Sequence, residues 1–574
     1  TIAKGVGRVA SWFGWSKPEI LDKASFVKNQ PFQNGAILSG AQTEYKIACD
    51  PKNELTVDPS IGGVDGDDMA LARLCATKSF IGSFTWKDTD VAMTDVLWKT
   101  GISPMMGVFL GDLAGTGGNT HYFQDSAMSF AARPFTYWRG NIKLTFEIVC
   151  SKFHRGKLLF RYEPNTSQYG LIASSPAQLN QQNTTILDIQ NGQQITFDID
   201  WAQMRSWAVI PVRATDWSPI QYTNDIRGDT TTPYIPGLDA STQTFHADEM
   251  NGVLEVRVLN ELVQPTPLSD VSINVYAWSD DMSFALPTER HLPTNRSYSV
   301  QSAIIGTEHI TEEHAEEKLV QNSSSMDKIH LDHMGEKVVS LRSLLKRFTT
   351  VSWWSKSVAS IGIGYFNLVN FNIPVIKNGP KPSGYTPSGN HEERHLFQYM
   401  KWSYMGLRGG MKHRVRIFGD TNPSLHSYSN VRLLQADDSF DTSAIGIAQY
   451  ANSIGDLTNG AVDGVEDYPI HASLANRIDG GINYHHASNG GIEYVTPYYS
   501  SNLFEFSFCA DPAGYGNDTI GGHSAWWCNK HAVAIAANPT LSSNVVLLED
   551  IATGEDFTFF RFQGASPFGI NSGG

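Results

Sequence analysis

The stretch Phe135 to Tyr162, FTYWRGNIKLTFEIVCSKFHRGKLLFRY, reads as two adjacent β-strands, and the rest of the chain is interpreted from it. Between residues 142 and 148, apolar side chains alternate with polar ones such as Lys143 and Thr145. A period of two is typical of a strand with one buried and one exposed face. The apolar pattern restarts at Leu158, so a second strand is predicted there.

An altered copy of this stretch occurs far downstream, at Phe397 to Phe418, FQYMKWSYMGLRGGMKHRVRIF. In both copies an aromatic run leads into an Arg-Gly pair, Arg139-Gly140 in the first and Arg408-Gly409 in the second, so the offset between the copies has the size of a domain. A solenoid would repeat every ~20 to 50 residues. A single repeat at the size of a domain instead predicts two homologous β domains in tandem.

Length and composition fit this class of protein. At 574 residues the chain is too long for one hydrophobic core and suits two large all-β domains, with 50 Gly and 26 Pro residues to supply turns. The net charge of −15 and the pI near 5.6 exclude a long-range attraction of the whole chain for RNA or for an anionic membrane. Any contact with RNA is therefore expected to be local.

The five cysteines are far apart in the sequence and include no C-x-x-C pair. This spacing indicates a reducing compartment without structural zinc, and no cofactor is predicted. No apolar run reaches the ~18 to 20 residues that a membrane-spanning helix needs, so a soluble protein is expected. The chain begins with Thr rather than Met, which we interpret as release from a longer precursor or trimming.

Composition divides the chain into five segments. Residues 1–15 place apolar side chains near one helical face, which fits either a frayed terminus or a peptide that touches a membrane. Residues 16–75 lack periodicity, as an extended arm does, and alternating patterns predict a first sandwich at 76–292 and a second at 351–574. Between them, residues 293–350 contain a Glu-rich stretch without a strand pattern, which predicts the domain boundary.

Further strands are predicted at Ile195–Ile199, Trp207–Val212, Val253–Leu259 and Val271–Trp278. Strands separated by long loops fit a Greek-key sandwich rather than alternating βα units. Just before the second sandwich, apolar residues at helical spacing between Val338 and Phe348 predict a docking helix.

One segment matches a catalytic motif. His391 to His395, HEERH, has the H-E-x-x-H pattern in which two His one helical turn apart bind zinc and the Glu polarises a water. The surrounding sequence reads as a loop, and no third ligand follows at a suitable spacing. The solvated first turn of a helix that carries Phe397 and Tyr399 inward explains these residues better.

Four stretches of the sequence resemble segments of a known protein family. The stretch Phe135 to Asn165 resembles the corresponding region of a picornavirus-type capsid jelly roll. Phe13 to Pro18, FGWSKP, resembles the junction between the small internal capsid peptide and a major capsid subunit in dicistroviruses and marine algal RNA viruses (marnaviruses). Val495 to Ser500, VTPYYS, resembles a Pro-Tyr-Tyr strand motif of the family, and Gly554 to Pro567 resembles its closing strand.

The resemblance implies an all-β fold of two tandem eight-stranded antiparallel jelly rolls with extended N-terminal arms and a few short helices. It implies a structural capsid protein of the virion and the host cytoplasm, with no enzymatic activity beyond an autocatalytic maturation cleavage. The implied partners are other capsid subunits, including a third jelly-roll subunit, genomic RNA, a host receptor and, for the N-terminal peptide, a membrane. The rival classes are a secreted jelly-roll lectin, which would predict a signal peptide and paired cysteines, and the zinc hydrolase.

The same resemblance implies two processing sites. Trp15-Ser16 would be the maturation cut that frees the internal peptide. Gln301-Ser302, a Gln before a small residue in a polar segment, resembles a site of the family's chymotrypsin-like cysteine protease, and Gln321-Asn322 is the alternative.

A maturation cut needs a base near Ser16, and Asp437 or Asp438 is the candidate. A desolvated acidic pair can hold one raised pKa and accept a proton near neutrality, whereas a solvated pair cannot. The Asp-Asp-Phe motif that the family associates with this cleavage is interrupted here by Ser439, and Glu555-Asp556-Phe557 is the competing near-match.

Overall fold

The computed structural model describes residues 46–50, 53–56, 61, 66–113, 120–164, 183–210, 238–239, 244–245, 248–265, 270–289, 292, 315–320, 330, 332–357, 364–371, 396–419, 428–434, 481–485, 491–499, 503–507, 530–537, 544–566 and 568–571. Strands in mainly antiparallel sheets dominate these residues, and the helices are short. The predicted all-β class is confirmed. No helix in this part of the chain is long and apolar enough to cross a membrane.

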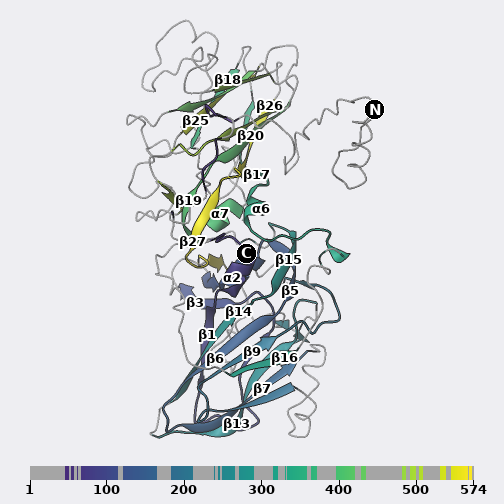
Figure 1. Ribbon diagram of the computed structural model, residues 1–574, viewed down its shortest axis with the longest axis vertical. Coiled ribbons are helices and arrows are strands. Elements are labelled where there is room, and N and C mark those ends of the chain that lie inside the picture. Colours follow the sequence, from purple (N-terminus) through teal and green to yellow (C-terminus); the bar gives the residue numbers. More distant parts are fainter. Residues whose placement is uncertain are drawn as a thin grey trace, which may run out of the picture. The chain divides into compact units, whose positions relative to one another are not determined.

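The first half of the chain folds into a sandwich of two sheets. One sheet has the strand order β1-β14-β6-β9 and the other has the order β2-β13-β7-β8, so early and late strands alternate as in a jelly roll. The strands of the first sheet lie side by side in Figure 1. The bounds are β1 Ser79–Trp86, β2 Val96–Gly101, β6 Ile142–Val149, β7 Arg155–Glu163, β8 Asn183–Asp188, β9 Gln194–Ile199, β13 Val253–Val263 and β14 Val271–Trp278.

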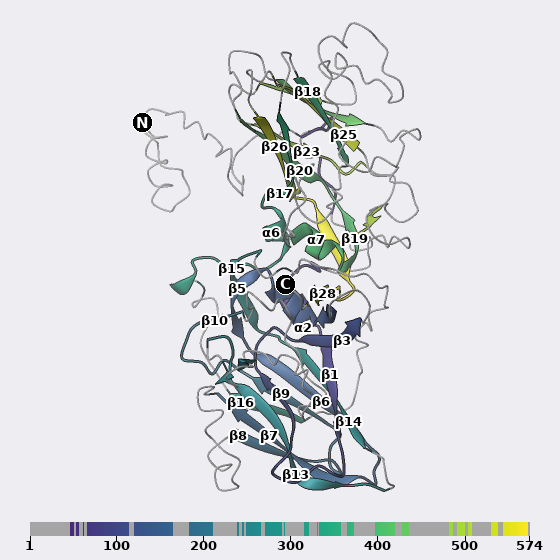
Figure 2. The same ribbon diagram turned by 180° about the vertical axis from the view of Figure 1, so that it is seen from behind.

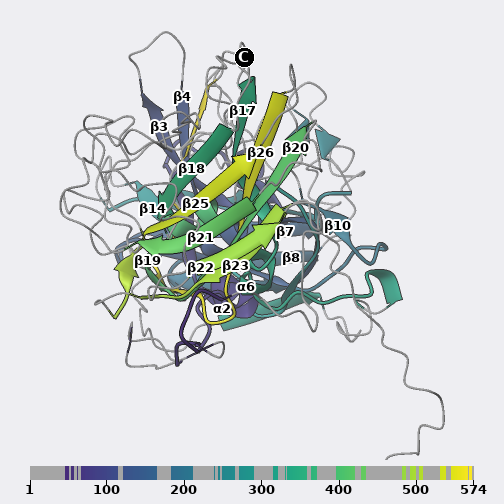
Figure 3. The ribbon, with the colours of Figure 1, turned by 90° about the horizontal axis from the view of Figure 1, so that it is seen from above.

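The second half repeats this arrangement. Its sheets have the orders β17-β26-β20-β23 and β18-β25-β21-β22, and both are labelled in the view of Figure 3. Matching each strand to its counterpart in chain order reproduces the two sheets of the first sandwich, so the predicted pair of tandem jelly rolls is confirmed. The bounds are β17 Thr349–Ser357, β18 Gly364–Phe371, β20 Met411–Gly419, β21 Tyr428–Leu434, β22 Gly481–His485, β23 Gly491–Thr496, β25 Lys530–Ala537 and β26 Asn544–Thr553.

A helix and the central strand of a small three-stranded sheet precede the third strand of each sandwich, and the repeat extends to them. Helices α3 (Ala127–Ala132) and α7 (Leu396–Lys401) are offset along the chain by the same step as the two Arg-Gly pairs. Ser126 caps α3, because its hydroxyl accepts from Ser129 N. The small sheets are β10-β5-β15 and β24-β19-β27. Their bounds are β5 Phe135–Gly140, β10 Ala208–Val209, β15 Met282–Pro287, β19 Tyr404–Arg408, β24 Glu505–Phe506 and β27 Thr558–Phe562.

The repeated Arg-Gly pair marks the same backbone turn in both halves. Gly140 has φ +153° and Gly409 has φ +115°, in a region that residues with a side chain rarely adopt. A Cβ on Gly140 would lie 2.2 Å from Asp281 O, and one on Gly409 would lie 2.3 Å from Phe557 Cα. Glycine is therefore required at each of these turns, where the chain passes from the small sheet into the main sandwich of the same half.

The stretch first read as two adjacent strands contains three, and the two main ones do not pair. Strand β6 lies in one sheet of the first sandwich and β7 lies in the other. Their apolar faces meet across the core, where the Phe146 and Phe160 rings are 5.0 Å apart. The prediction of adjacent strands was wrong in this respect, because the period of two gives the buried face of a strand but not its neighbour.

The structure corrects three other predictions. Strand β16 (Ala315–Val320) pairs in parallel with β9, at the edge of the sheet seen in Figure 2, although this Glu-rich stretch showed no strand pattern. Only α6 (Arg342–Leu345) of the predicted helix at 338–348 forms, because Val339 O and Leu341 N bond the backbone of the first half instead. Of the predicted strand at 207–212, only β10 lies in a sheet among the described residues.

Five further strands and one helix complete the described elements. Strands β3 (Gly107–Leu113), β4 (Thr120–Asp125) and β28 (Phe568–Asn571) form a sheet in which the last strand of the second half pairs with a hairpin of the first. The remaining elements are the pair β11 (Leu238–Asp239) and β12 (Thr244–Phe245), and helix α2 (Leu71–Ala76).

Candidate functional site: the inter-sandwich contact

The two sandwiches meet through short helices and loop segments and through the small sheet of the second half. We call this region the inter-sandwich contact. The first half contributes residues 67–71 and helix α3, and the second half contributes residues 339–342, helix α7 and strands β19 and β27. Buried side chains from both halves belong to one continuous hydrophobic cluster. The halves therefore share a core at this contact.

An aromatic stack lies at the centre of the contact. The ring of Phe130 on α3 stacks on Tyr399 of α7, with centroids 4.6 Å apart and planes 18° apart. The Tyr399 hydroxyl donates to Phe130 O at 3.1 Å. Phe562 and Tyr404 approach the same Phe130 ring at 5.1 and 6.3 Å. Such rings combine a large buried area with directional contacts, so the stack is the main apolar anchor of the contact.

A backbone pairing lies beside the stack. Ala70 and Ser340 form an antiparallel bridge, in which Leu71 N donates to Val339 O and Leu341 N donates to Met69 O, both at 3.0 Å. Backbone hydrogen bonds of this kind fix the register of two segments, so the alignment of the halves here does not depend on side-chain packing alone.

Corresponding positions of the two repeats touch each other in this contact. The step along the chain from Phe130 to Tyr399 equals the step from the first Arg-Gly pair to the second. The step from Ala70 to Ser340 is longer by a single position. A contact between the same patch on two partners is isologous and has a twofold axis. The inter-sandwich contact therefore has pseudo-twofold character, as if one domain had paired with a copy of itself.

Two adjacent carboxylates carry the polar part of the contact. Asp67 accepts from the Ser340 hydroxyl at 2.7 Å, and the Arg342 guanidinium is 3.7 Å away. Asp68, which is 5% exposed, accepts from Arg561 N at 2.6 Å and pairs with Arg73 at 2.9 Å.

Burial raises the pKa of Asp68 above its ordinary value, and the backbone amide of Arg561 and the charge of Arg73 only partly oppose this. The Tyr404 hydroxyl donates to Asp68 O at 3.3 Å, and burial also raises its pKa. The contact therefore holds a carboxylate whose charged form is unfavourable because the side chain is buried.

Part of the N-terminal arm lies against the second sandwich. Lys46 forms a parallel bridge with Val495, and Ile47 N donates to Val495 O at 2.9 Å. Farther along, Leu55 N donates to Asp556 at 3.1 Å. The arm that precedes the first domain is thus held by the second one.

The acidic pair Glu555-Asp556 has structural partners. Asp556 also accepts from Gly410 N at 3.0 Å, so its two oxygens tie the arm to a turn of the second sandwich. Glu555 pairs with Lys346 and, at 3.7 Å, with Lys412. Partial burial raises the pKa of Glu555, but Lys346 and Lys412 lower it by more. The pKa of this carboxyl therefore lies below its ordinary value.

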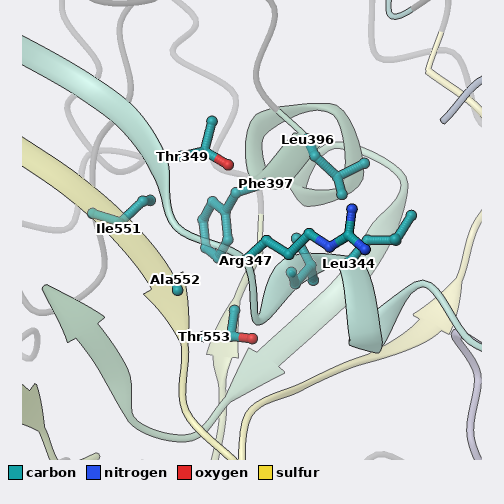
Figure 4. Close-up of a pocket in the computed structure, with 9 residues that line it drawn as sticks. Leu344, Arg347, Thr349, Leu396, Phe397, Ile551, Ala552 and Thr553 are labelled. Carbon is teal, nitrogen blue, oxygen red and sulfur yellow. The ribbon is translucent and has the colours of Figure 1, made fainter. Parts of the chain in front are cut away.

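A hollow next to the contact is lined by α6, α7, β17 and β26. Figure 4 shows the Phe397 ring beside Thr349 and Ile551, with the Arg347 side chain running past it. The volume open to the centre of a water-sized sphere is about 10 Å³. This is room for about one water molecule, so we interpret this hollow as a gap in the packing.

The residues proposed for processing fall outside the described part of the chain. This holds for Trp15, Ser16, Gln301, Ser302, Asp437 and Asp438, and also for His391 and His395. Helix α7 begins just after the histidine motif, and Phe397 and Tyr399 are buried in it, as expected.

Sequence reasoning did not identify the inter-sandwich contact. Asp67 and Asp68 belong to a segment without periodicity, and Ser340 lies in a segment whose pattern predicted a helix. The available signal was the repeat itself, since the helices that bear Phe130 and Tyr399 occupy corresponding places in it.

Comparisons with known proteins find similarity to virus structural proteins. Residues 326–572 match the family model described as CRPV capsid protein like. This range includes all the described strands of the second sandwich.

Relatives are found among structural polyproteins of insect viruses. The chain is 24% identical over 386 residues to the structural polyprotein of Cricket paralysis virus (isolate Teleogryllus commodus/Australia/CrPVVIC/1968), covering 59% of this chain and 40% of that one. The structural polyprotein of Acute bee paralysis virus (strain Rothamsted) is 23% identical, covering 61% and 40%. The chain thus spans about 40% of the length of these relatives.

Solved virus structures are also similar. A marine algae virus of the order Picornavirales matches with a TM-score of 0.38 and 24% identity, covering 48% of this chain and 95% of that one. The Triatoma virus empty capsid matches with a TM-score of 0.37 and 20% identity, covering 48% and 95%. Residues 326–572 thus match the CRPV capsid protein like family, and the polyprotein relatives support the interpretation of this chain as a segment of a picorna-like capsid polyprotein.

Proposed function

We propose that this chain is a structural capsid protein whose two jelly rolls build an icosahedral shell, with a third jelly-roll subunit, around a positive-strand RNA genome. The observation that carries the proposal is the family match at 326–572 over a sandwich whose strand order the first half repeats. The inter-sandwich contact gives the pair a fixed arrangement, which a repeating building block requires. The role is structural, and the site of action is the virion, reached by assembly in the host cytoplasm.

Electron microscopy of the purified chain tests this function directly. Regular shells or closed oligomers that protect RNA from nuclease support it. A chain that stays monomeric at high concentration and protects no RNA contradicts it. Stoichiometric zinc found by elemental analysis would favour the hydrolase at His391 and His395 instead, and binding to a glycan array by the monomer would favour the lectin.

The proposal includes a cut between Gln301 and Ser302. The inter-sandwich contact is compatible with it, because residues before and after that bond share backbone pairing and a common core. Mass spectrometry of mature particles should find an N-terminus at Ser302. An intact peptide that spans residues 301 and 302 contradicts the cut.

The proposal also includes a maturation cut at Trp15-Ser16, with Asp437 or Asp438 as the base. The freed peptide would carry apolar anchors and two cations, Lys4 and Arg8, to an anionic membrane during genome entry. Replacing both aspartates by Asn should leave residues 15 and 16 joined in purified particles. Unchanged cleavage in that variant removes the assignment but leaves the capsid function in place.

A further inference from the structure

The hollow beside the inter-sandwich contact contains a buried hydroxyl that the protein leaves unpaired. Thr553, the last residue of β26, lines this hollow and is 1% exposed. Its Oγ1 atom has no hydrogen-bond partner among the residues that the structure describes. Burying a hydroxyl without a partner is costly, so most such groups in proteins bond another polar group or an ordered water. The unpaired Thr553 hydroxyl therefore indicates that the hollow holds a small polar molecule.

A second hydroxyl lies on the same face of the sheet. Thr349 on β17 pairs with Ile551 on β26, and Thr553 is two positions farther along β26. Residues two apart on a strand share a face, so both threonines line the hollow. Side chains related diagonally in this way have Cβ atoms about 7 to 8 Å apart or somewhat less. This is too far for a direct hydrogen bond of about 2.8 Å between the two oxygens, but one bridging molecule spans it.

The chemistry of the lining limits which molecule can bind there. The Arg347 side chain passes the Phe397 ring, as Figure 4 shows, and none of the nine described residues that line the hollow is acidic. A guanidinium group only donates hydrogen bonds, whereas a threonine hydroxyl both donates and accepts. A metal cation would find no carboxylate in this lining and would be repelled by Arg347. Water both donates and accepts, so it suits all three polar side chains.

The size of the hollow fits a single water molecule. Its volume open to the centre of a water-sized sphere is about 10 Å³. A bound water needs about 10 to 15 Å³ by this measure and two to four polar partners. Thr349, Thr553 and Arg347 supply three partners, and apolar side chains such as Leu344 and Leu396 line the rest. Organic ligands occupy pockets of several hundred Å³, so the hollow is too small for them.

We propose that one ordered water molecule binds in this hollow and joins Thr553 Oγ1 to Thr349 Oγ1, with Arg347 as a further donor. The water accepts from one hydroxyl and donates to the other, so the Thr553 hydroxyl gains a partner. The bridge lies where β17 and β26 meet helices α6 and α7. Since α7 carries Tyr399, the water supports the helix that stacks on Phe130 of the first sandwich. The site does not depend on the proposed function, because it belongs to the fold of the second sandwich.

A double-mutant cycle in the full chain tests the bridge. Thr553→Val and Thr349→Val should each lower the midpoint of urea unfolding, because each leaves the water with one partner fewer. The double variant should lose little more than the larger single loss, since either substitution already breaks the bridge. Thr553→Ser keeps a hydroxyl and should not lower the midpoint as Thr553→Val does when the two are compared in the Thr349 background. The control is Thr85→Val, at an exposed position of β1, which should leave the midpoint unchanged.

Several outcomes would overturn the water site. If Thr553→Val raises the urea midpoint, the hydroxyl was unpaired in the folded chain, because removing an unsatisfied buried group stabilises a core. Additive losses in the two single variants would show that nothing links the hydroxyls. Replacing chloride by a larger anion at constant ionic strength should shift both wild type and Thr553→Val equally, and a shift confined to wild type would identify a bound anion instead. A structure that resolves ordered water should show density within hydrogen-bond reach of Thr553 Oγ1, and no density there would reject the site.

Discussion

Phe130 and Tyr399 occupy corresponding positions in the two jelly rolls, and they stack on each other with ring centroids 4.6 Å apart. A residue that packs against its own counterpart lies near the axis that relates the copies, and for a single pair of copies this axis is twofold. The contact between the halves thus has the geometry of a homodimer interface within one chain.

The first prediction concerns this stack. Phe130→Ala should lower the free energy of unfolding by about 3 to 5 kcal/mol, because it leaves a cavity shared by both halves. Tyr399→Phe keeps the ring and loses the hydrogen bond to Phe130 O, so its cost should be about 1 kcal/mol. Urea unfolding measures both. Phe153→Ala, at a 77% exposed residue, is the control and should stay within about 0.5 kcal/mol of wild type.

The second prediction compares Thr145 on β6 with Arg414, which occupies the corresponding position on β20. In the second sandwich, buried Asp550 accepts from Arg414 and Arg416, each at 2.8 Å. Asp550→Asn should cost about 3 to 5 kcal/mol, since two guanidinium groups lose their shared counter-charge. In the first sandwich, Thr145 and Thr196 only share a hydrogen bond, and replacing both by Val should cost less than about 1 kcal/mol. Similar losses in both variants would contradict this difference.

The third prediction is a pH dependence from Asp68. Its pKa is raised in the folded chain above the ordinary 3.8, so the folded state holds this proton more tightly than the unfolded state does. The contribution of Asp68 to stability therefore falls as pH rises from about 3.8 through the raised pKa, and is constant above it. Thermal midpoints of wild type and Asp68→Asn across the acid range check this. Parallel profiles for the two proteins would show that Asp68 does not titrate in that window.

The fourth prediction has the opposite sign. Lys346 and Lys412 outweigh partial burial and lower the pKa of Glu555 below the ordinary 4.5. The stability that Glu555 provides is therefore present above pH 4.5 and is lost as pH falls through the lowered pKa. Glu555→Gln should remove this acid-side loss from the same thermal profiles. A variant that becomes more sensitive to acid than wild type would disprove the assignment.

The fifth prediction concerns the arm. Asp556→Ala leaves Leu55 N and Gly410 N without their acceptor, which should cost about 1 to 3 kcal/mol. The arm around residue 55 should then be cut faster by a nonspecific protease, while the core strands stay protected. Asp188→Ala, at a partly exposed surface pair with Lys157, is the control and should leave the rate of arm cleavage unchanged.

The sequence by itself determined the strand content, the duplication and the resemblance to capsid proteins. Alternation at 142–148 is local information, since successive side chains of a strand point to opposite faces. The spacing of the two Arg-Gly pairs determined the repeat, because the glycine at each is required by a backbone turn that no other residue fits.

Only the tertiary structure decided which segments meet. A strand's pattern gives its buried face but not its neighbour, so β6 and β7 read as adjacent although they lie in opposite sheets. Residues 338–341 had a helical pattern, yet pairing with residues 69–71 of the first half used their backbone groups and shortened the helix. Hydrogen bonds and desolvation at such contacts depend on residues in the other half of the chain, and local propensity carries no information about them.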